Sequence, residues 1–374
     1  MNSLLLEKDS IPKLIINGHE FKGWRELSIH RSMEMIAGTF DLTFYSDQKN
    51  TSKNKLSNEL KEDAEPTKII QPGERCTVQI GDQTVITGFI DGVRHGVNSS
   101  GTTLEVYGRD QTADCVDCSS LIQSRVWNQV KLETLSQDLL KPFGISFLHP
   151  QDTGPVFPSW SIHEESVFEN LVKAASLRGL ILISDGKGSL VALRAGMGKL
   201  SEEKPFLEIH EQPGVLDFYV TRDFKNRFSH YQTRGANYGV QSEGVNLQFV
   251  VAPVLDSEIK RFRPLLIAQE GETRKPVVQD RLTWEKNKRR AQSEQIQISV
   301  LGWRDSQRRL FTPTDFVSLN LPSIGVSGKY LLISSYFTLD DKGPRTHLHL
   351  ERRLSMTLDP TLQARESTPS WSVF

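Results

Sequence analysis

The chain has 374 residues, enough for two or three domains with hydrophobic cores of their own. Its 45 lysine and arginine residues balance 46 aspartate and glutamate residues, which argues against a dedicated nucleic-acid-binding protein with its usual basic excess. Three cysteines, Cys76, Cys115 and Cys118, exclude a disulfide scaffold and indicate folding in a reducing compartment. The N-terminus lacks the apolar core of a signal peptide, and no apolar run reaches the length of a membrane helix, so we expect a soluble protein without membrane insertion.

The short strands and frequent turns of residues 1–110 predict a small antiparallel β-barrel or a sandwich, and we take the barrel as the prediction. Short runs alternate polar and apolar side chains, as in residues 39–44, 77–80 and 103–106, and such a period buries one face of each strand. The core is predicted to contain Leu42, Phe44, Val78, Ile80, Leu104 and Val106. Residues 46–66 contain almost no apolar side chain and are predicted to form a long polar loop inserted between two strands.

Residues 111–213 are predicted to form an α+β domain. Leu132, Leu135 and Leu139 recur at helical spacing before a proline and a glycine that end the run. A second helix is predicted from about residue 164 to 178, with Gly179 at its C-terminal cap, followed by a hairpin with a glycine-containing turn.

The last third of the chain returns to strand patterns. Residues 214–235 together with 296–356 are predicted to form a second small β-barrel. Residues 236–295 are predicted to be an inserted segment with a basic helix, whose charges we interpret as a solvated face. Residues 357–374 are predicted to be a loose tail. The fold class is therefore α+β and mainly β, with two similar small antiparallel barrels.

The two β regions show a weak internal duplication. The parallel segments are residues 29–31 with 220–222, 40–42 with 228–231, 72–80 with 313–321, 88–91 with 330–333, and 103–106 with 346–350. Two explanations remain open: any two antiparallel barrels share such alternation, or one barrel is used twice in the chain. In the second case a trimer would present six similar barrels, so that a three-fold object could bind a six-fold ring.

No motif indicates a metal or cofactor site. Cys115-x-x-Cys118 lacks the further ligands that a structural zinc ion needs, and His347-x-His349 lacks a third ligand. No nucleotide-binding or zinc-protease motif is present either. We expect no cofactor, no metal and no sequence-specific nucleic-acid binding.

Catalysis has equally little support. Glu164 and Glu165 are the nearest approach to a carboxylate pair for glycoside hydrolysis, and they fit the start of a helix better. We expect no catalytic residues and no enzymatic activity.

Short blocks of residues occur in a characteristic order along most of the chain. They contain Arg31, Glu34, Gly38, Phe40, Gly108, Arg109, Asp110, Asp114, Gly179, Asp223, Phe224, Arg227, Phe228, Tyr231, Arg261, Arg263, Pro264 and Trp303. Each block is unspecific by itself, but together they resemble the baseplate hub family of contractile phage tails of the Mu type. We interpret these residues as structural.

The resemblance implies a homotrimeric ring with two barrels per subunit and pseudo-six-fold symmetry, joining a six-fold tail tube to a three-fold membrane-piercing spike. It implies as partners further copies of the chain, the tube protein, the spike protein and other baseplate components. It implies a location in the virion tail baseplate after assembly in the host bacterial cytoplasm. The chain departs from the family pattern in the insertion at 46–66 and carries no appended spike or lysozyme-like domain, so piercing and cell-wall digestion are expected of other proteins.

Two other classes of function remain open. A tail-associated hydrolase acting on the cell wall or on surface polysaccharide would need a cleft with two convergent carboxylates, at least one with a raised pKa. A carbohydrate-binding receptor module would expose clustered tryptophan or tyrosine side chains, whereas the aromatic residues here fall mostly on predicted core faces.

Overall fold

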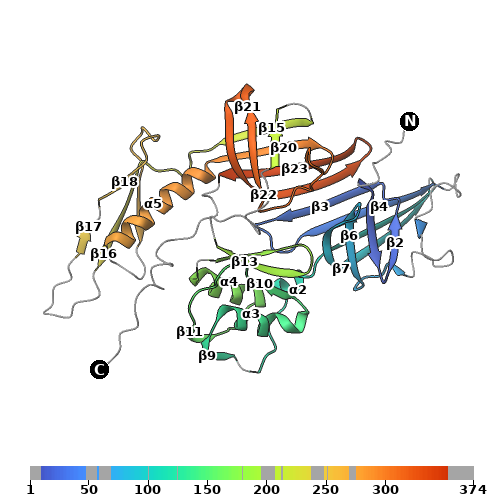
Figure 1. Cartoon of the computed structure of the whole chain (residues 1–374), viewed down its shortest axis with the longest axis horizontal. Coiled ribbons are helices and arrows are strands. Elements are labelled where there is room, and N and C mark those ends of the chain that lie inside the picture. Colours follow the sequence, from blue (N-terminus) through green and yellow to red (C-terminus); the bar gives the residue numbers. More distant parts are fainter. Residues whose placement is uncertain are drawn as a thin grey trace.

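The computed structural model describes residues 10–47, 57–58, 69–99, 101–123, 125–178, 180–194, 207–211, 214–236, 248–250, 252–268 and 275–352. Strands dominate these residues, as the alternation predicts. Figure 1 shows a large sheet, an α+β domain beside it and a smaller unit around one long helix. None of the helices in the described part of the chain is long and apolar enough to cross a membrane.

The first half of the large sheet comes from the N-terminal region. Its strands are β1 (Pro12–Ile16), β2 (His19–Lys22), β3 (Glu26–Ser32), β4 (Thr39–Asp47), β5 (Ser57–Asn58), β6 (Arg75–Ile80), β7 (Gln83–Asn98) and β8 (Gly101–Asp110). Alternate residues of these strands are buried, because one face of the sheet packs on the core. Five of the six predicted core residues are buried and Phe44 is half-buried against the same cluster. Of the predicted loop 46–66, residues 46–47 end β4 and residues 57–58 form β5. The rest of this segment lies outside the described residues.

The second half of the sheet comes from the C-terminal region. Its strands are β14 (Leu207–His210), β15 (Val215–Arg222), β20 (Glu294–Leu301), β21 (Phe316–Leu321), β22 (Val326–Asp340) and β23 (Gly343–Arg352), with a short 3-10 helix η3 (Pro322–Ile324) before β22. The predicted tail at 357–374 lies outside the described residues.

The two halves have the same strand order. In the first half it is β3-β4-β8-β7-β6-β1, and in the second it is β15-β20-β23-β22-β21-β14. The long hairpins match in detail, since the β7–β8 ladder shifts register between Ile90 and Gly92, and the β22–β23 ladder between Leu332 and Ser334. One difference is that β14 pairs parallel with β21 whereas β1 pairs antiparallel with β6. The topology therefore supports one architecture used twice in the chain.

One of the parallels predicted from sequence is wrong. The strand order shows that the counterpart of β4 in the second half is β20 and not residues 228–231. The reason is that a separate unit is inserted between β15 and β20. Tyr231 belongs to this inserted unit, whose strands alternate in the same way as those of the large sheet. Alternation alone does not distinguish the two.

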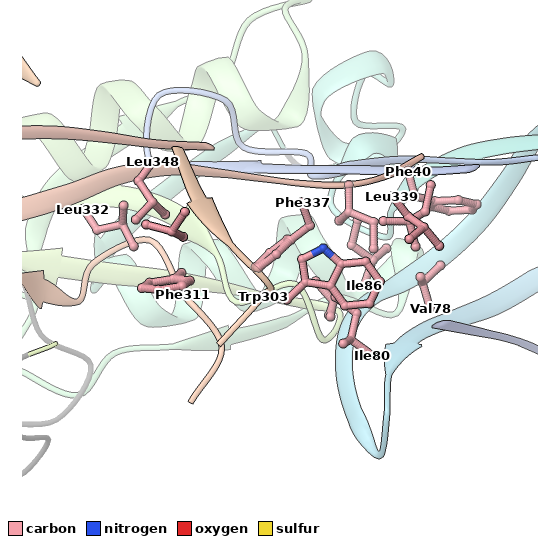
Figure 2. Close-up of a cluster of buried hydrophobic side chains, with 14 of the residues drawn as sticks. Phe40, Val78, Ile80, Ile86, Trp303, Phe311, Leu332, Phe337, Leu339 and Leu348 are labelled. Atoms are coloured by element: carbon pink, nitrogen blue, oxygen red, sulfur yellow. The ribbon is translucent and has the colours of Figure 1, made fainter. Parts of the chain in front are cut away.

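Neither half closes into a separate barrel within the described strands. They form one open fourteen-stranded sheet instead, because β22 extends past β21 and its Ser334–Leu339 segment pairs with β3. The halves share one hydrophobic core, in which Trp303 and Phe337 lie near Phe40 and Val78 (Figure 2).

The α+β domain lies between the two halves in sequence. It contains α2 (Ala113–Asp117), β9 (Val126–Val130), α3 (Leu132–Leu140), the 3-10 helix η2 (Lys141–Phe143), β10 (Ser146–Leu148), β11 (Phe157–Ser161), α4 (Val167–Leu177), β12 (Leu180–Ser184) and β13 (Ser189–Arg194). The two helices and the hairpin predicted here are confirmed. A separate core lies beneath α3 and α4, and Gly144 follows η2 in the left-handed conformation that ends such a turn. Gly179 lies outside the described residues.

A small unit is inserted into the second half. It contains β16 (His230–Ala236), β17 (Gln248–Val250), β18 (Val254–Leu255), β19 (Pro264–Ala268) and α5 (Lys275–Gln292). The predicted basic helix is confirmed as α5, which packs on β16 and β18. Among the described strands β16 pairs only with β17, β18 and β19 of this unit, so the insertion begins after β15.

Candidate functional site

Asp110 ends β8 where the large sheet continues into the α+β domain. Its Oδ2 accepts a hydrogen bond from the Gly38 backbone N–H at 2.7 Å, and its Oδ1 accepts one from the Thr112 N–H at 2.8 Å. The Thr112 hydroxyl donates to the same Oδ1. Burial raises the pKa of Asp110, and the hydrogen bonds from Thr112 and Gly38 act against that rise. Asp110 therefore fixes the turn that leaves the sheet.

Arg31 lies where both sheet halves and the α+β domain meet. It stands on β3, and its guanidinium donates to the Ser184 carbonyl oxygen at 3.3 Å. Burial lowers the pKa of Arg31, while the carboxylates of Asp110, Asp185 and Asp315 act to raise it. These three carboxylates come from the first half, the α+β domain and the second half respectively, so the charge of one arginine interacts favourably with carboxylates of both sheet halves and of the α+β domain.

Glycines allow close backbone contacts at this junction. A Cβ on Gly108 would lie 2.1 Å from the Phe89 carbonyl oxygen and 2.7 Å from Cζ of Phe40. A Cβ on Gly186, in the β12–β13 turn with φ of +73°, would lie 2.5 Å from the Val85 carbonyl oxygen. The motif residues Arg31, Gly38, Phe40, Gly108 and Asp110 therefore converge on one structural junction.

Replacing Gly108 by alanine is expected to lower the free energy of unfolding by about 2 kcal/mol, because the new methyl group overlaps backbone that cannot move freely. Gly96→Ala is the matched control on β7, since its nearest neighbour would be 3.7 Å away. Urea denaturation followed by circular dichroism measures both variants. Equal stability of the two variants would contradict the proposed tight approach.

The motif residues Arg109, Asp114 and Glu34 lie around this junction and are half-buried or exposed. Arg109 pairs with Asp91 at 2.7 Å and with Asp117 at 2.8 Å, so it links β7 and β8 to α2. Hydrogen bonds to these two carboxylates raise the pKa of Arg109. Asp114 lies in the first turn of α2, and burial raises its pKa. Glu34 is exposed and lines a cleft together with residues of β15 and α5.

A second group of motif residues gathers in the small inserted unit, around a buried ion pair. The Arg227 guanidinium donates to both carboxylate oxygens of Asp256, at 2.7 to 3.1 Å, and to Glu258 at 2.8 Å. The side chains of Arg227 and Asp256 are only 3% and 4% exposed. Burial acts to lower the pKa of Arg227, but the hydrogen bonds to Glu258 and Asp256 raise it overall. The Phe224 ring covers the guanidinium at 4.5 Å.

Aromatic residues complete the core of this unit. Tyr231 is buried, and its hydroxyl oxygen accepts a hydrogen bond from the Phe228 N–H at 3.1 Å. The Arg263 guanidinium lies 5.3 Å from the centre of the Phe228 ring and donates to the Lys225 carbonyl oxygen at 2.6 Å. Pro264 begins β19, Asp223 accepts from the Lys225 N–H at 2.7 Å, and Arg261 is exposed.

Trp303 belongs to neither group. It is 1% exposed in the core of the large sheet, and its indole N–H donates to the Thr338 carbonyl oxygen at 3.0 Å. The sequence did not single out Asp256, Asp185 or Asp315, the carboxylates that face the motif arginines. Asp256 and Glu258 form an Asp-x-Glu pair directly after β18, which is the one local sign of an acidic partner for Arg227.

These residues are arranged for packing and charge pairing. A cleft of about 740 Å³ lies between the sheet halves and the α+β domain, and Asp185 and Asp315 in it interact with Arg31. Among the described residues, no group of three or more histidine, cysteine, aspartate or glutamate side chains is placed to hold a metal ion. Asp110, the buried carboxyl with a raised pKa, is held by Gly38 and Thr112 and does not line this cleft.

Comparison with known proteins gives matches along most of the chain. Three family models match successive parts: "Mu phage baseplate assembly protein GpP-like, N-terminal" at residues 12–110, "Baseplate hub protein gp44-like, second domain" at 112–194, and "Mu phage baseplate assembly protein GpP, fourth domain" at 274–358. Baseplate hub protein gp44 of Escherichia phage Mu is 29% identical over 349 residues, covering 90% of this chain and 86% of that protein.

Solved structures agree with these matches. The crystal structure of the 43 kDa tail protein of prophage MuSo2 from Shewanella oneidensis is 30% identical and superposes with a TM-score of 0.77, covering 93% of this chain and 99% of that chain. The tail protein from Neisseria meningitidis MC58 has the same fold, with 20% identity, a TM-score of 0.70, and coverage of 92% and 98%.

A fold shared along its length with tail proteins, and motif residues used as structural junctions, define a structural protein of a phage-type tail. The sequence resemblance is confirmed. The chain belongs to the family of Mu-like baseplate hub proteins, and its function is that of a structural baseplate hub.

Proposed function

We propose that the chain forms a homotrimeric ring of pseudo-six-fold symmetry that joins the six-fold tail tube to the three-fold membrane-piercing spike. The observation that carries this proposal is the repeated strand order of the two sheet halves. Three chains supply six copies of one architecture, so the ring can match a six-fold partner on one face and a three-fold partner on the other.

The two symmetries have separate sources in the chain. The large-sheet halves occur twice, whereas the α+β domain and the unit around α5 occur once per chain. A trimer therefore carries six sheet halves but only three copies of each inserted part. In this proposal the sheet halves meet the tail tube, and the inserted parts give the ring its three-fold features.

The role is one of assembly without catalysis or cofactor. The motif residues act structurally, by holding the sheet halves and the inserted parts in fixed relation. Partners are other copies of the chain, the tube and spike proteins and further baseplate components. The ring works in the baseplate of the virion tail and assembles in the host bacterial cytoplasm. A permanent ring needs subunit interfaces that are large and substantially apolar.

Light scattering after size exclusion is expected to give a mass of about 127 kDa, three times the chain mass of 42.3 kDa. The mass should persist on dilution and across salt concentration if the interfaces are mainly apolar. A monomer at every concentration, or a closed assembly of another size, would contradict the trimer.

A further inference from the structure

Several strand edges of the large sheet have no partner strand in the described part of the chain, among them those of the short strands β5 and β14 and two longer ones. One is the outer edge of β15, which ends the sheet. The other is the distal part of β7, from Gly92 to Val97: β6 pairs only with the first part of β7, up to Phe89, and beyond it β7 pairs only with β8. Unpaired strand edges are templates for pairing with another chain.

The internal duplication shows which edges belong together. Ser334–Leu339 of β22, which corresponds to the open part of β7, pairs antiparallel with Leu27–Ser32 of β3. In the shared strand order, β3 takes the place of β15. The junction between the two halves is therefore a pairing of the same two kinds of edge that remain open at the ends.

The ladders fix the correspondence residue by residue. The register shifts of the two long hairpins align Ser334 with Gly92, and therefore Tyr336 with Arg94. The same alignment makes Glu351 of β23 the counterpart of Arg109 of β8. Gln295 is the cross-strand partner of Glu351, and Thr39 is the cross-strand partner of Arg109, so Gln295 corresponds to Thr39.

The same ladders align β15 with β3. Thr221 faces Gln295 in the second half as His30 faces Thr39 in the first. Thr221 therefore corresponds to His30, which is the partner of Tyr336 within the chain.

We propose that β7 of one subunit pairs antiparallel with β15 of the next copy, with Gly92–Val97 opposite Phe218–Asp223. Arg94 then faces Thr221 and Gly96 faces Tyr219, in the register that Tyr336 and Thr338 keep with β3. This inference rests on the proposed ring and specifies the contact that closes it. The contact is heterologous, so it generates a ring when its rotation closes.

The exposure of the two edges agrees with a missing partner. Val97 is 76% exposed, whereas its counterpart Leu339, covered by β3, is 8% exposed. Phe218 and Val220 are only half-buried against the core, whereas their counterparts Leu27 and Ile29 are buried. Pairing with a second copy would cover Val97 on β7 and Phe218 and Val220 on β15, as the pairing of β22 with β3 covers their counterparts within the chain.

The polar face also fits a second copy. Tyr336 and His30 make an edge-to-face contact across the internal junction, with ring centres 5.9 Å apart. At the proposed junction Arg94 faces Thr221 and lies diagonally from Asp223, so opposite charges meet on the same face. The side chains of Arg94 and Asp223 are both exposed in the single chain.

Paired cysteines test the register directly. Arg94→Cys with Thr221→Cys, in a Cys118→Ser background, places two thiols opposite each other across the junction. The remaining cysteines, Cys76 and Cys115, are buried. Mild oxidation to the disulfide, or a short bifunctional thiol-reactive cross-linker such as a bis-maleimide, is expected to give covalent dimers and trimers on a non-reducing gel. Arg94→Cys with Val220→Cys is the control one residue out of register, where the side chains point to opposite faces.

The solution mass of each variant distinguishes failure of the proposed strand pairing from failure of the proposed trimer. Cross-linked trimers in the first variant but not in the control support the pairing. A trimeric mass with no cross-link in the first variant, or with equal cross-linking in both, overturns the pairing and leaves the trimer. A monomeric mass for the parent protein overturns both.

A charge on the β7 edge gives a second test. Val97→Asp is expected to raise the concentration at which the trimer dissociates at least tenfold, with an unchanged far-ultraviolet circular dichroism spectrum. Val126→Asp is the matched control, because Val126 is an exposed valine on β9 in the α+β domain. Trimers of equal strength in both variants would overturn the proposed edge.

Discussion

Replacing Trp303 by alanine is expected to lower the free energy of unfolding of the large sheet by about 3 to 5 kcal/mol. The indole is 1% exposed in the core that both halves share, and Figure 2 shows it in the same cluster as Phe337 and Ile86. The alanine variant leaves a cavity and also leaves the Thr338 carbonyl oxygen without its donor. The whole stability of a domain is about 5 to 15 kcal/mol, so this is a large fraction of it.

Urea denaturation followed by circular dichroism measures the effect, with two comparison variants. Trp303→Phe keeps most of the ring volume and loses the hydrogen bond, so it should cost less than the alanine variant. Leu301→Ala truncates an exposed side chain at the end of β20 and is expected to change stability by at most about 0.5 kcal/mol. A loss below about 1 kcal/mol for Trp303→Ala would show that the two halves do not depend on one core.

Local patterns in the sequence identify most individual elements. Leu132, Leu135 and Leu139 predict α3 because their spacing places them on one helix face, and all three are buried. The same is true of the alternating strands around Leu42 and Val106, which need only a buried and a wet face. Element type follows from such local periods.

The pairing of strands does not follow from local periods. The edge contact between β22 and β3 joins residues some 300 positions apart, and nothing near Ser334 or Ser32 specifies the partner. The two closed barrels were predicted for this reason, because alternation shows which face of a strand is buried but not where the sheet continues. The placement of Tyr231 in the large sheet failed in the same way, since β16 has the same alternation in a different unit.

The motif residues follow a similar division. Their positions were readable as blocks, but their partners come from distant segments, such as Gly38 with Asp110 and Arg227 with Asp256. Only the folded chain shows that one group holds the junction of three parts and another holds the inserted unit. The block around Trp303 acts alone in the core.

Replacing Asp256 by alanine is expected to unfold the inserted unit, at a cost of about 3 to 5 kcal/mol, because it leaves the buried guanidinium of Arg227 without its main partner. Glu258 also accepts from Arg227, but it is 45% exposed and cannot replace the bidentate contact. Glu258→Ala is therefore the matched control, with an expected loss of about 1 kcal/mol or less.

Hydrogen exchange resolves where the loss falls. Amides of β16 and α5 are expected to lose protection in Asp256→Ala, while those of β4 and β8 keep theirs, because the unit has its own small core. The double variant Arg227→Met with Asp256→Leu should regain much of the protection, since an apolar pair of similar size needs no charge compensation. If the double variant loses as much amide protection as Asp256→Ala, the inserted unit depends on the bidentate hydrogen bonds between Arg227 and Asp256 themselves. If amides of β4 also lose protection, the inserted unit supports the large sheet.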